Sequence, residues 1–543
     1  MDRRFFLRLT AMAAATSLAN WRFAGAAPKA PSAAYNAIVV GAGLGGLSCA
    51  AHLAQSGFKT LLLEQYGVPG GYATSFTREA KGRIFSCEVS LHSSSLRSPD
   101  MRALLTGLGV FDALPLVEHE FAWSSRFPEF SLDVPARTGL NGFERQLTGL
   151  FPGEAKGLED FFSLWRGVMD DMDKLQAAPP GASRLMFPLT YKNLWYIRDK
   201  TLGELVDARV SDARAKAVLT QSCGYFGLPP SRLSAFYYLI PMGGYLQFGG
   251  QYVKGTSQVL SNALARAIEK AGGEIRYGEE VASLVMMDGR AAGVRTVDGK
   301  EYLAQAVICN ASAPQVFSRF LPPDALPGKE RERLERSSNS PGSCIVWLGL
   351  DKDVSGLCDS AELSFYPNLD MEATYAAAME NDFTKSGFSL MVYDKLVPGF
   401  SPPGCSTVSL TALCGFGHWK PFEKDYFAGR KTAYDAEKER LTGMLIAQAE
   451  KLAIKGLSQM IVMRESSTPL TNKRYTLNTA GAIYGFNQTV DNSFMTRQPN
   501  ETGLPGLYLA SAWGDPGGGF GGAIMGGKNA FKAVATTLTK PSA

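Results

Sequence analysis

One segment near the start of the chain constrains the fold more than any other. Residues 35–65 read YNAIVVGAGLGGLSCAAHLAQSGFKTLLLEQ and open on an apolar run that is typical of a buried strand. Gly41, Gly43 and Gly46 complete a GxGxxG motif, and apolar residues follow at helical spacing. A second strand-like run ends at Glu64. Strand, glycine turn, helix, strand and acid in this order predict a Rossmann-like α/β domain.

Each part of this motif has a physical role in holding a dinucleotide. The glycines, with Leu44 and Gly45 between them, allow the backbone to approach a pyrophosphate, whose charge the helix N-terminus stabilises. The carboxylate of Glu64 suits hydrogen bonds from ribose hydroxyls. The motif therefore predicts a dinucleotide site, and it does not by itself choose between NAD and FAD.

A second glycine-rich segment lies near the end of the chain. Residues 513–527 read WGDPGGGFGGAIMGG, after the strand-like LYLAS and before a helix-like run. Strand, glycine turn and helix recur here without the GxGxxG spacing, so we interpret the segment as a second part of the nucleotide site. A flexible linker is the alternative. We expect Gly526 and Gly527 to allow close packing of the helix on the sheet.

Further motifs resemble one superfamily of flavoproteins. QYGVPGGYATSF places Gly70 and Gly71 directly after the acidic strand end, and further blocks follow at residues 82–94, 249–285 and 481–486. These segments resemble the amine oxidase and phytoene desaturase superfamily, and most of all its retinol saturase and carotenoid isomerase branch. The resemblance runs along nearly the whole chain after residue 34.

The resemblance implies FAD as the cofactor and a role for particular residues. Gly70 and Gly71 would pack along the dinucleotide, and Val281 would lie on a strand that meets its adenine end. The helix start at Gly519, Phe520 and Gly521 would meet the pyrimidine edge of the flavin, with Asp515 in the same block. Three positions depart from the family pattern: Tyr72 stands where Arg is usual, Glu88 where Asp is usual, and Ser90 where Gly is usual.

The order of these blocks implies a discontinuous organisation. Residues 34–100, 243–330 and 480–540 are expected to form one Rossmann-like FAD-binding domain of the GR2 type. Residues 101–242 and 331–479 are expected to form a discontinuous α+β substrate domain. The fold class is therefore α/β.

The function implied by the resemblance is redox chemistry on carbon–carbon bonds of a hydrophobic polyene such as a carotenoid or retinoid. Saturation, desaturation and isomerisation all remain open. His92 and Glu88 lie in a block expected to border the flavin, and we take them as candidates for proton transfer, with a structural role as the alternative for His92. Two other functions remain: a flavin amine oxidase-like enzyme, and a non-catalytic flavin-containing lipid-binding protein.

Composition excludes several other classes. The formal charge of +4 falls to about +1 once the first 26 residues are set aside, so no basic surface for nucleic acid is expected. The chain has four histidines and contains neither HExxH nor CxxC spacing, which makes a metal site improbable.

The N-terminus predicts export. Residues 1–26 combine the pair Arg3 and Arg4 with a short apolar stretch and a small-residue site, a pattern that resembles a bacterial twin-arginine signal. We therefore expect the twin-arginine translocase as a transient partner and the periplasm as the location. Aromatic and basic residues alternate at 184–199, which suits a peripheral membrane contact where an apolar substrate enters.

Overall fold

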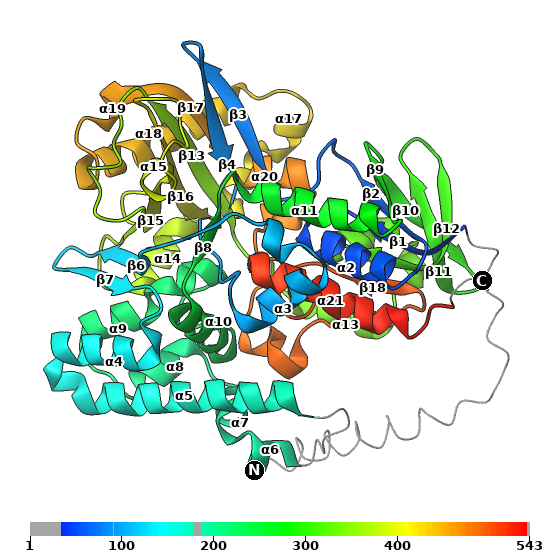
Figure 1. Ribbon diagram of the computed structural model, residues 1–543, viewed down its shortest axis with the longest axis horizontal. Coiled ribbons are helices and arrows are strands. Elements are labelled where there is room, and N and C mark those ends of the chain that lie inside the picture. Colours follow the sequence, from blue (N-terminus) through cyan, green and yellow to red (C-terminus); the bar gives the residue numbers. More distant parts are fainter. Residues whose placement is uncertain (1–33, 91, 179–185, 540–543) are drawn as a thin grey trace.

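The computed structural model describes residues 34–90, 92–178 and 186–539. The predicted export signal and Arg184 lie outside these residues. Two seven-stranded sheets form the centre of the molecule. In Figure 1 the first sheet lies on the right and the second at the upper left, with a group of helices below the second.

The first sheet is built around the strand that precedes the GxGxxG motif. That strand is buried along its whole length, as its apolar run predicts for a central parallel strand. The sheet order is β10-β11-β12-β1-β2-β9, and β18 pairs with β12. Its strands are β1 (Tyr35–Val40), β2 (Thr60–Glu64), β9 (Glu274–Tyr277), β10 (Val281–Met287), β11 (Arg290–Thr296), β12 (Glu301–Cys309) and β18 (Leu507–Leu509).

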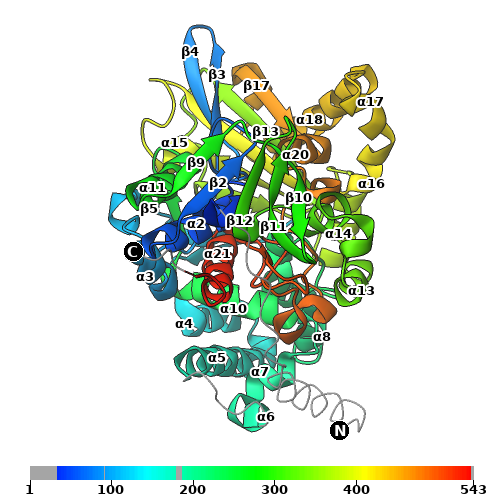
Figure 2. The same cartoon turned by 90° about the vertical axis from the view of Figure 1, so that its right-hand side faces the viewer.

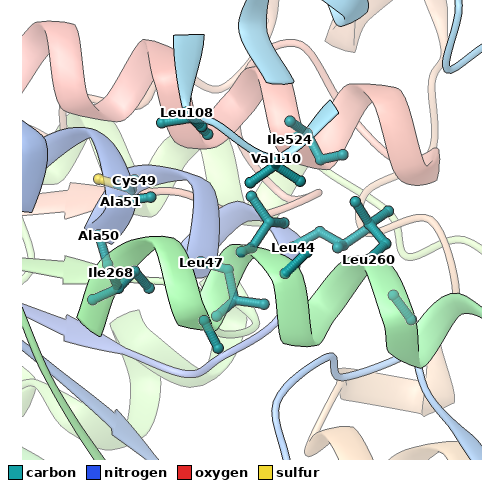
Figure 3. Packing of buried hydrophobic residues seen from close by; sticks show 14 of the residues in the cluster. Leu44, Leu47, Cys49, Ala50, Ala51, Leu108, Val110, Leu260, Ile268 and Ile524 are labelled. Atoms are coloured by element: carbon teal, nitrogen blue, oxygen red, sulfur yellow. The ribbon is translucent and has the colours of Figure 1, made fainter. Parts of the chain in front are cut away.

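Three helices pack together beside this sheet: α2 (Leu44–Gln55), α11 (Ser257–Lys270) and α21 (Gly519–Ala535). Figure 3 shows the side chains between them, with Leu47 and Ala50 of α2 facing α11. Helices α2 and α21 approach closely, because a Cβ at Gly527 would lie only 2.2 Å from the carbonyl oxygen of Gly45. Gly527 therefore packs against a helix, and the expectation that it packs on the sheet is wrong.

The second sheet separates a core from a cavity. Its order is β17-β13-β16-β15-β14-β6-β7, antiparallel except between β14 and β6. Along β13, Cys344, Val346 and Leu348 join a core that also contains residues of α18, while the alternating Ile345 and Trp347 face a cavity. The elements are β6 (Phe121–Arg126), β7 (Ser131–Pro135), β13 (Gly342–Leu350), β14 (Glu362–Phe365), β15 (Phe388–Val392), β16 (Ser406–Cys414), β17 (Ile461–Ser467) and α18 (Thr432–Leu452).

A helical group with an aromatic core lies next to the second sheet. Phe161, Phe162 and Trp165 of α5 are fully buried there. In Figures 1 and 2 this group occupies the end of the molecule opposite the β3–β4 hairpin. Its helices are α4 (Gly139–Leu150), α5 (Ala155–Ala177), α6 (Phe187–Thr190), α7 (Lys192–Ile197), α8 (Leu202–Asp207), α9 (Ala213–Thr220) and α10 (Ala235–Phe248), and the hairpin is β3 (Ser75–Ala80) with β4 (Arg83–Glu88).

The strands of each sheet come from separate sets of segments. The first sheet uses strands from 34–100, 243–330 and 480–540, and the second uses strands from 101–242 and 331–479. One small sheet crosses this division, because β5 pairs with β8. The remaining elements are β5 (Leu116–Glu118), β8 (Gln251–Val253), α3 (Pro99–Gly107), α12 (Ala313–Gln315), α13 (Gly328–Arg336), α14 (Met371–Met379), α15 (Tyr393–Leu396), α16 (Phe416–Trp419), α17 (Glu423–Phe427), α19 (Leu457–Met460) and α20 (Pro469–Thr476).

Among the residues that the structure describes, every helix is too short or too polar to cross a bilayer.

Candidate functional site

One large cavity connects the glycine motifs to the second sheet. Its volume is about 1040 Å³, and its wall includes the carboxyl ends of β1 and β2 and the inward face of β13. This placement follows the general rule that ligands of parallel sheets bind at the carboxyl ends of the strands. Ten of the predicted cofactor residues line it: Gly41, Gly43, Leu44, Gly45, Glu64, Gly70, Gly71, Val281, Gly519 and Phe520.

The first glycine turn lies where side chains would not fit. Gly41 has a φ of +94°, and a Cβ at Gly45 would lie 1.9 Å from the carbonyl oxygen of Ala510. With its amide oriented to make both bonds, Asn310 accepts from the Gly43 N–H and donates to Ala510 O, each at 2.9 Å. The turn is thus held between β1 and the residues after β18, with bare backbone facing the cavity.

Glu64 and the second glycine pair lie beside this turn. The Glu64 carboxylate accepts hydrogen bonds from the N–H groups of Ala42 at 2.7 Å and Tyr66 at 2.9 Å. Burial raises the pKa of this carboxyl, although both N–H groups favour its charged form. Gly70 donates its N–H to Ala42 O at 2.7 Å and forms a parallel bridge with Gly43. The two glycine segments, residues 41–45 and 70–71, thus form one wall of the cavity, which we call the glycine wall.

The N-termini of α2 and α21 lie at the cavity and suit an anionic cofactor. Helix α2 starts at Leu44 and α21 at Gly519, and both residues line the cavity. Within the described residues no side chain caps either N-terminus, so the first-turn N–H groups can serve phosphates and the flavin edge. Bare glycine backbone, two helix N-termini and the carboxylate of Glu64 fit a dinucleotide such as FAD.

Three predicted cofactor residues lie behind this wall and support it. A Cβ at Gly46 would lie 2.1 Å from Gly41 O, so this glycine closes the turn. A Cβ at Gly521 would lie 3.5 Å from Cε of Met101 in α3. Asp515 accepts a hydrogen bond from Asn529 at 3.1 Å, and burial raises the pKa of its carboxyl. The structure therefore gives Gly46, Gly521 and Asp515 contacts within the protein and leaves them off the cavity wall, and their contacts with the cofactor stay a prediction.

The rest of the cavity is a chamber with a mostly apolar and aromatic wall. The contributing side chains come from the helical group, the second sheet and the segment before β18. Such a wall suits a long apolar molecule with few polar groups. The wall includes Leu228, Phe365, Tyr366, Phe388, Leu413, Ile483 and Tyr484.

His92 lies in the cavity wall, paired with a residue that the sequence did not suggest. Its Nδ1 is 3.5 Å from Oε1 of Glu362, the first residue of β14. The hydroxyl of Tyr225, in the 3₁₀ helix Gln221–Phe226, donates to the same oxygen at 2.7 Å. Burial alone would raise the pKa of Glu362, but His92, His119 and Tyr225 outweigh it and lower the pKa to about 2.

Glu88 is buried behind the wall and caps a helix. Its Oε1 accepts from Ser257 Oγ at 2.5 Å, and its Oε2 accepts from Ser257 N at 2.7 Å and from Tyr252 OH at 3.2 Å. Ser257 is the first residue of α11, so the carboxylate meets the positive end of that helix. Only 1% of Glu88 is exposed. These contacts indicate a structural role, in contrast to the acid–base role suggested from the sequence.

The other histidines have structural partners. The His52 ring is stacked on Phe531, with ring centroids 5.2 Å apart, and His418 Nε2 lies 2.6 Å from Glu437 Oε1. His119 Nε2–H donates to the His92 carbonyl oxygen at 2.9 Å. Among the described residues, no group of three or more His, Cys, Asp or Glu side chains is placed to hold a metal ion.

The aromatic segment 186–199 lies away from the cavity. Of its described residues, none belongs to the cavity wall. A substrate entrance at this segment stays a prediction. Tyr191 is buried, whereas Met186, Leu189 and Tyr196 are exposed by 50%, 74% and 43%.

Asn310 and Glu362 are the main site residues that sequence reasoning missed. Asn310 directly follows β12. This position could have been predicted from the sequence, because ligands bind at the carboxyl ends of parallel strands. Glu362 opens a short strand in the sequence AELSF and has no motif around it. Only the folded chain brings it to His92.

Comparison with known proteins agrees with this site. The family described as flavin containing amine oxidoreductase matches residues 44–535, well over half of the chain. A chloroplastic prolycopene isomerase from Daucus carota is 24% identical over 522 residues, covering 93% of this chain and 80% of the relative. An all-trans-retinol 13,14-reductase from Danio rerio is 24% identical over 476 residues, covering 83% and 77%.

A solved structure of an oxidoreductase from Methanosarcina mazei shares the fold. Its TM-score is 0.57 at 18% identity, and the match covers 92% of this chain and 100% of that one. The predicted α/β fold with a Rossmann-like FAD-binding domain is confirmed, as are FAD and the predicted superfamily. The chain belongs to the family of flavin containing amine oxidoreductases.

Proposed function

We propose that this protein is an FAD-dependent oxidoreductase that acts on carbon–carbon bonds of a hydrophobic polyene, such as a carotenoid or retinoid. The observation that carries the proposal is the continuity of the cavity, which joins the glycine wall to an aromatic chamber within one space of about 1040 Å³. An extended, conjugated chain can lie against such a wall. Similarity to a prolycopene isomerase and a retinol reductase supports the same class of substrate.

The residues of the chain then have separate tasks. When bound, FAD supplies hydride or electron transfer. The glycine turns and the N-termini of α2 and α21 hold its phosphates and one edge of its ring system. The apolar wall, with Leu228, Phe365 and Tyr484, holds the polyene and excludes water. His92, in the same wall, is positioned to hold or move a proton at Nε2, because its Nδ1 faces Glu362.

The test begins with the flavin. Purified protein is expected to show a bound-flavin absorption spectrum, and a colourless protein that cannot be reconstituted with FAD would overturn the proposal. The holoprotein, with its flavin reduced in one sample and oxidised in another, is then mixed anaerobically with all-trans-retinol or a carotene, and the products are separated by chromatography. A saturated, desaturated or isomerised polyene is the expected product. Unchanged polyenes together with rapid flavin bleaching by an amine would assign an amine oxidase instead, and inertness to both would assign a binding protein.

We further propose that the precursor is exported to the periplasm by the twin-arginine translocase. Arg3 and Arg4 support this proposal, because they precede a short apolar stretch in the pattern of such signals. Changing both residues to lysine is expected to leave the precursor in the cytoplasm. Normal accumulation of the double variant in the periplasm would contradict the proposal.

A peripheral membrane contact is a separate proposal. It rests on exposed Met186, Leu189 and Tyr196, with exposed Lys192 beside them. Co-sedimentation with vesicles containing phosphatidylglycerol is expected to decrease when Leu189 is changed to Ser. Equal sedimentation of both proteins would contradict it.

A further inference from the structure

A charged and hydrogen-bonded group of side chains interrupts the apolar wall of the substrate chamber. It consists of His92, Glu362 and Tyr225, which we call the polar triad. The three residues come from the segment after β4, from the start of β14 and from the 3₁₀ helix Gln221–Phe226. Glu362 Oε1 is the shared atom, 3.5 Å from His92 Nδ1 and 2.7 Å from the Tyr225 hydroxyl.

The triad borders the space in which a substrate would lie. His92 and Tyr225 both line the cavity, and Tyr225 is 45% exposed because its ring forms part of the cavity wall. The side chains of His92 and Glu362 are only 11% and 13% exposed. Glu362 does not belong to the cavity wall, so it lies behind His92 and Tyr225, and its contacts orient both of them.

Stability is a weak explanation for keeping this pair in place. Removing a carboxylate and its polar partners from water costs about as much as their mutual interactions return, so a buried polar cluster of this kind seldom increases net stability. A purely hydrocarbon ligand would also cover the Tyr225 oxygen and His92 Nε2 without offering them a hydrogen bond, which is unfavourable in an apolar site. Both arguments favour a ligand that supplies polar atoms at this place.

The bonds already made restrict what the ligand can be. Tyr225 uses its proton on Glu362, so its oxygen is left as an acceptor. The pKa of Glu362 is lowered to about 2, so the carboxylate stays charged at neutral pH and repels a second carboxylate. Among the described residues, six ionisable groups interact with it: His92, His119, Tyr225, Tyr245, Tyr366 and Tyr393. A neutral hydroxyl can donate its proton to the Tyr225 oxygen or to His92 Nε2, and it carries no charge for Glu362 to repel.

We propose that the polar triad binds a hydroxyl group at one end of the substrate, so that the substrate is a polyene alcohol and not a pure hydrocarbon. This inference rests on the proposed function, because it assumes a polyene in the chamber. Tyr225 and His92 contact the hydroxyl, and Glu362 is a positioning residue that fixes both. The apolar wall then holds the remainder of the chain.

Binding measurements on the flavin-loaded protein test the inference. The probes are all-trans-retinol, the hydrocarbon in which its hydroxyl is replaced by hydrogen, and the corresponding carboxylic acid, each titrated anaerobically by fluorescence quenching with the flavin oxidised. We expect retinol to bind at least about tenfold more tightly than either of the others. In Tyr225→Phe and Glu362→Gln the preference for the alcohol is expected to fall to within about threefold.

A matched control lies in the same chamber. The Tyr366 hydroxyl donates to the Gln221 carbonyl oxygen at 3.1 Å and lies outside the triad, so Tyr366→Phe is expected to keep the preference for the alcohol. The flavin spectrum and the melting temperature of each variant show that it is folded. If the preference survives in Tyr225→Phe and Glu362→Gln, or is absent from the wild type, the inference is overturned.

A spectroscopic measurement tests the positioning role without turnover. The chain has four histidines, so ¹⁵N-histidine labelling of the holoprotein gives few signals, and a His92→Gln variant assigns the relevant one. Pairing of Nδ1 with Glu362 requires a proton on Nδ1, so neutral His92 is expected as the Nδ1–H tautomer. A neutral Nε2–H tautomer would overturn the positioning role of Glu362.

The outcomes also separate this inference from the proposed function. If the hydrocarbon binds as tightly as the alcohol and is converted, the inference fails and the proposed function stands. If none of the three polyenes binds to flavin-loaded protein, both fail. Selective binding of the alcohol that is lost in the two triad variants supports both.

Discussion

Glu88 offers the sharpest test of how the structure assigns roles, because it is a buried carboxylate in a block expected to border the flavin. The change to make is Glu88→Gln, which keeps the size of the side chain and removes its charge. The carboxylate accepts two hydrogen bonds from Ser257, the first residue of α11, and one from Tyr252 of β8. A glutamine has only one carbonyl oxygen to accept these hydrogen bonds. Its NH₂ group would face a donor of Ser257 or Tyr252, which then loses its partner.

The size of the effect follows from these contacts. A hydrogen bond to a charged group contributes about 1.5–3 kcal/mol, and leaving a buried donor without a partner costs about 1–3 kcal/mol. The favourable position of a negative charge at a helix N-terminus contributes about 0.3–1 kcal/mol more. We therefore expect Glu88→Gln to lower the free energy of unfolding by about 3–5 kcal/mol, a substantial share of the stability of a typical domain.

The assay compares stability with turnover. Thermal unfolding is followed by circular dichroism, and the rate of substrate conversion is divided by the flavin content. Glu79→Gln is the matched control, because Glu79 is exposed on the neighbouring strand β3. We expect the Glu88 variant to melt several degrees below the control with an unchanged rate per bound flavin. Equal melting with a large loss of rate per flavin would refute the reasoning and restore a catalytic role for Glu88.

Two further predictions concern the glycine turn and acid stability. Gly45→Ala is expected to abolish flavin binding, because its Cβ would lie 1.9 Å from Ala510 O, whereas Gly149→Ala, in open space at the end of α4, should retain the full flavin spectrum. Burial and two nearby lysines lower the pKa of His52 from 6.5 to about 4, so the unfolded chain binds a proton between these pH values that the folded chain does not. The free energy of unfolding therefore falls as the pH drops from 6.5 to 4. His52→Phe should reduce that loss by on the order of 2 kcal/mol, measured by denaturation at a series of pH values. The same dependence of unfolding free energy on pH in the variant and the wild type would contradict the assignment.

The cofactor half of the site was predictable because its signals are local. The first turn, its helix and its second strand span residues 35–65, and each step depends on neighbouring residues: apolar runs, glycine spacing and one acid. The structure places ten predicted positions in one cavity wall. Gly46 and Gly521 lie outside that wall, because a glycine motif also contains positions that serve backbone packing. Spacing alone does not separate packing glycines from glycines that face the cofactor.

The substrate half depends on contacts between distant residues. Glu362 meets His92 only because β14 lies in the second sheet between β15 and β6, and Tyr225 arrives from a separate helical segment. Periodicity in AELSF predicts a strand and gives no partner for its first residue. Glu88 shows the converse, since a family-like block suggested chemistry and the fold uses the carboxylate to cap α11.

Side chains along the strands of the second sheet face the core and the cavity alternately. This alternation explains how the substrate chamber can vary while the cofactor site stays the same. On β13, Val346 and Leu348 point into a core shared with α18, and Ile345 and Trp347 point into the cavity. Trp347 also donates its Nε1–H to the Glu88 carbonyl oxygen at 2.6 Å, which ties this face to the segment that leads to His92. A change at Ile345 therefore alters the chamber and leaves the glycine wall, which belongs to the first sheet, in place, whereas a change at Val346 or Leu348 weakens the second sheet itself. Selectivity for the substrate can thus change while the flavin site stays intact.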